Sequence, residues 1–221
     1  MEDTGVLVVP PGGLEDNERR PYPRVMAFVL AIIVGFVFGA LDQYLGTVHV
    51  TSHLGWWTIT VSGMSAPWLI LPFLAGMTQE RAKRAVALGV IVVMAALAGY
   101  FAMSNSVFES VPVANFWPRT VRMATTDANL LWIVGGLVTG PVYAYFGHRW
   151  RVARSWIGAA LVTLALCLEP LARSVVGTGF VGGGLNGSRT VWGAEIALGL
   201  IAAVVFVWMR VTDRRASRRR T

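Results

Sequence analysis

The stretch VSGMSAPWLILPFLAGM, from Val61 to Met77, is apolar enough to lie in a membrane, yet it contains residues that interrupt helices. Pro67 and Pro72 lack a backbone N–H, so each removes a helical hydrogen bond and frees the carbonyl four residues earlier. Pro67 falls near the middle of a segment of this length and would free the carbonyl of Gly63. Two interpretations are open: a discontinuous helix, as found at transporter substrate sites, or a kinked helix whose neighbours repair the hydrogen bonds.

The composition of the whole chain indicates a membrane protein. Of its 221 residues, 55% are hydrophobic and 14% are charged, whereas soluble domains have about 25% charged residues. The net charge of +7 lies in loops and tails between apolar runs, so we interpret it as a topology signal and predict no nucleic-acid partner. The single cysteine excludes an intrachain disulfide.

Six apolar runs are each close to the roughly 20 residues that a helix needs to cross a bilayer. They are Val25–Leu45, Trp56–Met77, Arg84–Ser104, Ala128–Gly147, Ser155–Arg173 and Val191–Arg210. We therefore predict an all-α, polytopic bundle of six transmembrane helices over residues 25–210. Residues 1–24, rich in acids, proline and glycine, predict a disordered cytoplasmic N-terminal tail, and residues 211–221 a basic cytoplasmic C-terminal tail.

The basic residues predict the orientation of these helices. One side of the membrane would hold only Arg119, Arg122, Arg173 and Arg189, and the other side would hold the remaining 15 of the 19 Lys and Arg residues. Because positive residues concentrate on the cytoplasmic side, both termini are predicted to be cytoplasmic. The expected location is a bacterial plasma membrane, with the lipid bilayer as the main partner.

Three carboxylates fall inside the predicted spans. Asp42, Glu169 and Glu195 each lie near the outer end of a span, about one helical turn (~5 Å) below the surface. Ionisable residues in a membrane are costly and often functional, so these three could line an outward-facing ligand or proton site. The structural alternative is ion pairing with Arg173 and Arg189 on the same side.

Prolines accompany two of the candidate site residues. Glu169 precedes Pro170, and a carboxylate beside a broken helix could bind a cation or carry a proton. Trp68 follows Pro67, so it would either line a pocket or fill a gap between helices. Pro67, Pro72 and Pro170 are the predicted positions of helix breaks.

Signatures of metal and enzyme sites are weak. His49 and His53 are four residues apart and could bind a metal together with Asp42, but their segment is β-branched and not expected to be helical. The sequence contains no P-loop, no zinc signature and no Ser-His-Asp arrangement. We therefore predict no metal, no cofactor and no enzyme activity.

Small residues recur at a spacing that lets membrane helices approach closely. The GxxxG pairs are Gly35 with Gly39 and Gly136 with Gly140, and Ala27 with Ala31 adds a similar face. These faces predict either packing within the chain or docking to a partner membrane protein.

The six-span layout and the SAPWLILPFLAG element resemble a family of uncharacterised actinobacterial membrane proteins, a domain of unknown function. This resemblance implies a membrane location and a helical fold over residues 25–210. The chain is more weakly similar to the substrate-binding subunits of energy-coupling-factor importers, small six-helix proteins with both ends inside. Those subunits use small residues on their first helix, comparable to Ala27 and Ala31, to dock a transmembrane partner.

Three functions compete on this basis. The first is transport of an ion or small molecule, or a subunit of such a transporter, with a polar pocket lined by Asp42, Glu169, Glu195 and Trp68. The second is a non-transporting partner or assembly factor of another membrane complex, which would need accessible small-residue faces. The third is a lipid-modifying enzyme that uses a carboxylate as acid or base.

Overall fold

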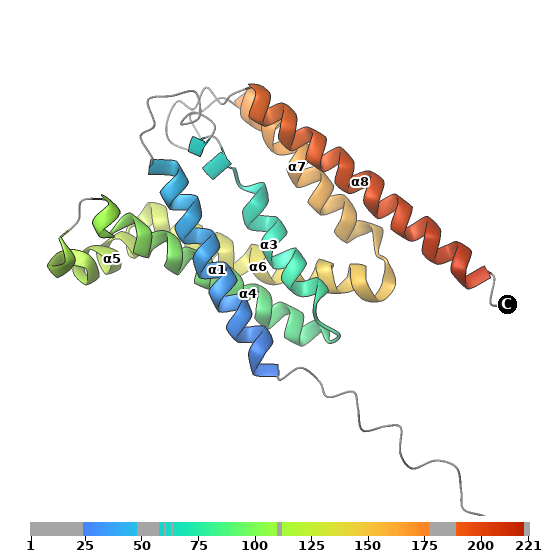
Figure 1. The fold of residues 1–221 in the computed structure, drawn as a ribbon, viewed down its shortest axis with the longest axis horizontal. Helices are drawn as coiled ribbons and strands as arrows, with labels where there is room; N and C mark the ends of the chain where they lie inside the picture. Colours follow the sequence, from blue (N-terminus) through green and yellow to red (C-terminus); the bar gives the residue numbers. More distant parts are fainter. Residues whose placement is uncertain are drawn as a thin grey trace, which may run out of the picture.

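The computed structural model describes residues 24–47, 58–59, 61–62, 64–109, 112–176 and 189–218. The regular structure of these ranges is helical (Figure 1). The α-helices are α1 (Arg24–Thr47), α3 (Ala66–Met77), α4 (Ala82–Ser104), α5 (Phe116–Ala124), α6 (Asp127–Ala153), α7 (Trp156–Val176) and α8 (Arg189–Arg218). Two short 3₁₀ helices, η1 (Val107–Glu109) and η2 (Val113–Asn115), lie between α4 and α5.

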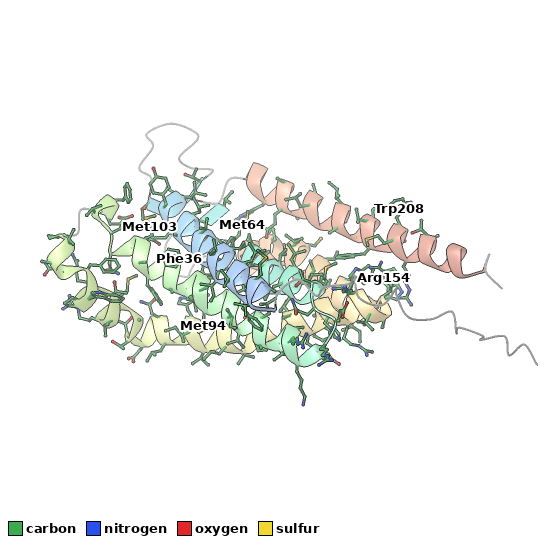
Figure 2. All side chains as sticks on the ribbon, turned by 60° about the horizontal axis from the view of Figure 1, so that its bottom comes forward. Phe36, Met64, Met94, Met103, Arg154 and Trp208 are labelled. Carbon is green, nitrogen blue, oxygen red and sulfur yellow. The ribbon has the colours of Figure 1, made fainter. Side chains whose placement is uncertain are left out.

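Four of these helices are long and apolar enough to cross a membrane, and two shorter apolar helices accompany them. The four are Val25–Thr47, Ala82–Ser104, Asn129–Ala153 and Trp192–Thr212, and the shorter two are Ala66–Met77 and Trp156–Pro170. Large apolar side chains cover their outer faces, among them Trp208, which stands on the outer side of α8 (Figure 2). The chain is therefore an integral membrane protein built from helices, and the six predicted apolar runs correspond to six apolar helices.

Helix α4 lies at the centre of the bundle, with α1 and α6 packed on its two sides (Figure 1). Its sequence is apolar around most of its circumference, as expected for a helix enclosed by others. Leu88, Val92, Val93 and Leu97 are almost fully buried and form the core of the first hydrophobic cluster.

The contact between α1 and α4 depends on small residues. A Cβ atom added to Gly39 would overlap the carbonyl oxygen of Ala96, and one added to Gly99 would overlap that of Phe36. Gly35 and Ala31 are buried on the same face of α1. The first GxxxG pair therefore packs within the chain, which is the first of the two interpretations of this pattern.

Helix α6 uses its own small residues in the same way. Gly140 faces the backbone of Gly89 on α4, and Gly147 faces the carbonyl of Phe73 on α3. Gly136 meets the side chain of Val93. The second GxxxG pair is thus also enclosed within the bundle, and a membrane partner would have to use another surface.

Helices α7 and α8 pack along each other as an antiparallel pair (Figure 1). Phe206 of α8 reaches the rest of the bundle, with ring centroids 4.6 Å from Trp150 and 6.2 Å from Phe73. Helix α8 runs to Arg218, so residues 211–218 of the predicted C-terminal tail continue this helix. The predicted N-terminal tail lies outside the described residues, apart from Arg24, where α1 begins.

Candidate functional site at the start of helix α3

The second apolar run is interrupted rather than continuous. Residues 58–59 and 61–62 are helical, Met64 and Ser65 are not, and α3 begins at Ala66. Pro67 therefore lies in the first turn of a new helix and not in the middle of a long one, which corrects the position predicted for it. The physical reason is that proline is well suited to the first helical turn, where its missing N–H would have no partner in any case.

The other two predicted breaks do not end their helices. Pro72 lies inside α3 and is almost fully buried, and α7 continues through Pro170. A membrane helix can tolerate an internal proline when neighbouring helices pack around it. The break in this protein is therefore located at Met64 and Ser65.

The N-terminus of α3 is held by a carboxylate from α7. Both oxygens of Glu169 accept backbone hydrogen bonds, at 2.6 Å from the N–H of Ser65 and 2.7 Å from that of Ala66. Ser65 itself makes no side-chain cap. A negative charge at a helix N-terminus is stabilised by the helix dipole and satisfies N–H groups that have no intrahelical partner. Glu169 of α7 is thus joined to residues that lie 104 and 103 positions earlier in the sequence.

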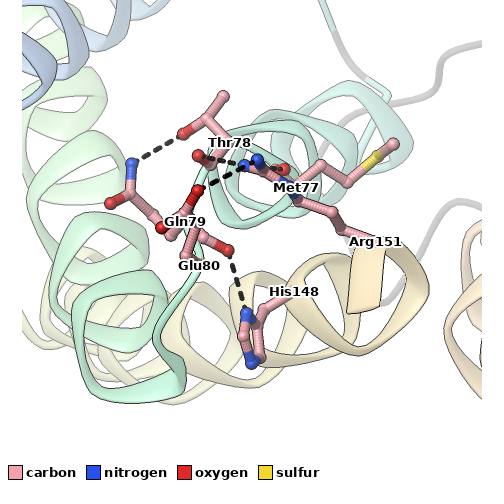
Figure 3. Close-up of polar contacts among 6 residues, drawn as sticks. All are labelled: Met77, Thr78, Gln79, Glu80, His148 and Arg151. Carbon is pink, nitrogen blue, oxygen red and sulfur yellow. Dashed lines mark hydrogen bonds and ion pairs between the residues drawn. The ribbon is translucent and has the colours of Figure 1, made fainter. Parts of the chain in front are cut away.

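A positive charge from α6 binds the opposite end of α3. The guanidinium of Arg151 donates to the carbonyl oxygens of Met77 at 3.3 Å and Thr78 at 2.6 Å, and it lies 3.7 Å from the carboxylate of Glu80. His148 Nδ1 is 2.9 Å from the carbonyl oxygen of Gln79 (Figure 3). The two ends of α3 are therefore complemented by charges of the sign that its dipole favours.

The first turn of α3 also reaches a second carboxylate. The indole N–H of Trp68 donates to Oδ2 of Asp42 on α1 over 3.3 Å, which is long for a hydrogen bond. The ring of Trp68 packs edge-to-face with Phe38, at 5.4 Å, and with Tyr100, at 6.3 Å. Asp42 is thus placed where α1, α3 and α4 meet.

Glu195, the third predicted carboxylate, belongs to the side of the bundle formed by α7 and α8. It is 4% exposed, and the carbonyl of the next residue, Ile196, lies 3.9 Å from the Sγ atom of Cys167 on α7. The side chains of Arg173 and Arg189, the predicted ion-pair partners, lie outside the part of the chain that is described.

The structure therefore places two predicted site carboxylates at one helical turn. Glu169 holds the backbone at Ser65 and Ala66, and Asp42 accepts a hydrogen bond from Trp68. Sequence reasoning placed Trp68 and Asp42 in one predicted pocket but did not predict the hydrogen bond between them. It missed Tyr100 and Phe38, whose only signal is that aromatic side chains recur near the outer ends of their helices.

Metal binding has no support in the described residues, where no group of three or more His, Cys, Asp or Glu side chains comes together. His49 and His53 lie outside these residues. The chain matches no model of a known protein family, no curated protein and no solved structure. The resemblances suggested by the sequence therefore stay predictions.

Proposed function

We propose that the protein is a membrane transporter of cations, protons among them, with its site at the start of helix α3. The observation that carries the proposal is the interrupted second apolar segment, whose first turn meets Glu169 through its backbone and Asp42 through Trp68. Interrupted helices with polar groups at the break are a recurrent feature of transporter substrate sites.

The proposed topology has six membrane segments with both termini in the cytoplasm. Helix α3 has 12 residues and is about 18 Å long, so it crosses only part of a bilayer of about 30 Å. The helical residues before the break, 58–59 and 61–62, would complete this segment. The basic end of the bundle, which includes Arg151, would face the cytoplasm.

The negative charge of Asp42 is the reason for proposing that the transported species is a cation. The described hydrogen-bond donor to Asp42 is a neutral indole. Within the part of the chain that the structure describes, no Lys, Arg or His forms an ion pair with Asp42. A carboxylate placed between helices is costly, and a bound cation or proton lowers that cost.

The proposal can be tested with purified protein in liposomes. A potassium gradient and valinomycin would impose a negative internal potential, and a pH-sensitive dye would report proton entry. We expect proton entry above that of empty liposomes, and we expect Asp42→Asn to reduce it to the empty-liposome rate because the variant side chain cannot hold a proton. Asp127→Asn, the same change at an exposed position at the start of α6, serves as the matched control. Equal proton entry with wild type and Asp42→Asn would refute the proposal.

The assembly-factor alternative is less well supported, because most of the small residues that suggested it pack within the chain. Gly35, Gly39, Gly136 and Gly140 pack against α4 inside the chain, and Ala31 is buried on the same face of α1. No other described surface singles out a protein partner, so we retain transport as the proposed function.

A further inference from the structure

We propose that Asp42, Phe38, Trp68 and Tyr100 form a binding site for a small organic cation of the substituted ammonium class. This inference rests on the proposed function and names the class of cargo. It starts from the composition of the cluster, one carboxylate with three aromatic rings contributed by three different helices.

The ring of Trp68 packs edge to face with each of the other two rings. The planes of Phe38 and Trp68 are inclined by 76°, and those of Trp68 and Tyr100 by 69°. In such a pair the edge of one ring covers the face of the other, so a ligand has to turn one ring aside to reach a face. Because aromatic faces carry negative potential, a face uncovered in this way would attract cations that are too weakly hydrated to prefer water, above all substituted ammonium groups.

The carboxylate supplies the charge that the rings lack. Phe38 and Asp42 are four residues apart on α1, so they share one face of that helix. The hydrogen bond from Trp68 to Asp42 is long and comes from a neutral group, so a cation can replace it at small cost. The indole would then be free to turn its face toward the cation.

The four residues of the cluster are partly accessible. All four side chains are half-buried, unlike the core residues Val92 and Ala96 of the same region. They lie near the end of α1 that precedes the break before α3. A site intended only for core packing would not need a carboxylate, which costs free energy to bury.

The test measures binding without transport. The full chain in mild detergent would be titrated with radiolabelled choline and, separately, with tetraethylammonium, using a scintillation proximity assay and competition. The neutral isostere of choline, 3,3-dimethyl-1-butanol, would be the competitor that lacks only the charge. We expect saturable binding of at least one of the two cations and no competition by the neutral alcohol.

Two variants identify the site. Asp42→Asn should weaken binding more than about tenfold, because a partly buried countercharge is lost. Trp68→Leu should weaken it about 2- to 30-fold, because the ring is lost while apolar bulk is kept. The matched controls, Asp127→Asn and Trp117→Leu, change exposed residues on the same side of the bundle and should bind as wild type does. Size-exclusion profiles would confirm that each variant is folded, and Asp42→Glu, which keeps the charge, should retain binding.

The outcomes separate this inference from the proposed function. If neither cation binds in a saturable, Asp42-dependent manner, the organic-cation site is refuted even where Asp42-dependent proton entry is observed. If cation binding depends on Asp42 but proton entry does not, the binding site stands and the transport proposal fails. Equal binding by wild type and by both Asp42→Asn and Trp68→Leu would overturn the assignment of these residues.

Discussion

Glu169 and Asp42 are two carboxylates that the sequence predicts at a similar depth in the membrane. The structure gives them different hydrogen-bond partners. Glu169 accepts two short, charge-assisted hydrogen bonds from backbone N–H groups at the positive end of a helix. Asp42 accepts one long bond from a neutral indole. The first arrangement satisfies a carboxylate, while the second is the basis for our proposal that Asp42 takes a proton or a cation.

The role of Glu169 predicts a loss of stability when its charge is removed. In Glu169→Gln one carboxylate oxygen becomes an NH₂ group, which cannot accept a hydrogen bond from Ser65 or Ala66. We expect a loss of about 1–3 kcal/mol, the cost of leaving a buried donor without its charged acceptor. Thermal unfolding in detergent, followed by fluorescence-detected size exclusion, would measure it. Glu109→Gln in η1 is the matched control, and equal melting temperatures for the two variants would argue against the capping role.

At the scale of elements, the short helix α3 is fixed by polar contacts at both ends and by close backbone packing along its length. Arg151 binds its C-terminal carbonyls, and Gly76 lies against the backbone of Ala144 on α6. Without a hydrophobic driving force between helices in lipid, such close contacts and interhelical hydrogen bonds are the available means of association.

The packing of α1 on α4 gives a prediction at this scale. Gly39→Ala adds a Cβ atom that would overlap the backbone of Ala96, so the helices must separate. The expected destabilisation is about 1–3 kcal/mol, typical of overpacking. Gly135→Ala is the control, since a Cβ atom there meets nothing within 4 Å. Unfolding in increasing concentrations of a denaturing detergent would compare the stabilities of the two variants. A Gly39→Ala variant as stable as Gly135→Ala would contradict the observed helix contact.

Sequence patterns predicted the apolar helices because each run carries its own signal of length and composition. The break before α3 was also signalled, by serine and proline at Ser65 and Pro67, a common start of a helix. Its position was predicted wrongly, because the whole apolar run was interpreted as one unbroken helix. The hydrogen bonds that Glu169 and Asp42 accept come from residues far away in the sequence, and no local pattern contains that information.

The whole molecule is a central helix, α4, with α1 and α6 at its sides and the α7 and α8 pair beside them (Figure 1). The orientation of this bundle decides which end of α3 faces the cytoplasm, and therefore the side from which Asp42 is reached. Arg151 and Glu80 mark one end of the bundle, while α5 and Asp127 mark the other.

Accessibility of single cysteines to a membrane-impermeant maleimide on intact cells tests this orientation most directly. In a Cys167→Ala background, Glu80→Cys and Thr125→Cys place one thiol at each end of the bundle, both at exposed positions. We predict labelling of Thr125→Cys on intact cells, and labelling of Glu80→Cys only after the membrane is permeabilised. Labelling of Glu80→Cys on intact cells, with Thr125→Cys protected, would show the reverse orientation and contradict the proposed outward-facing cation site.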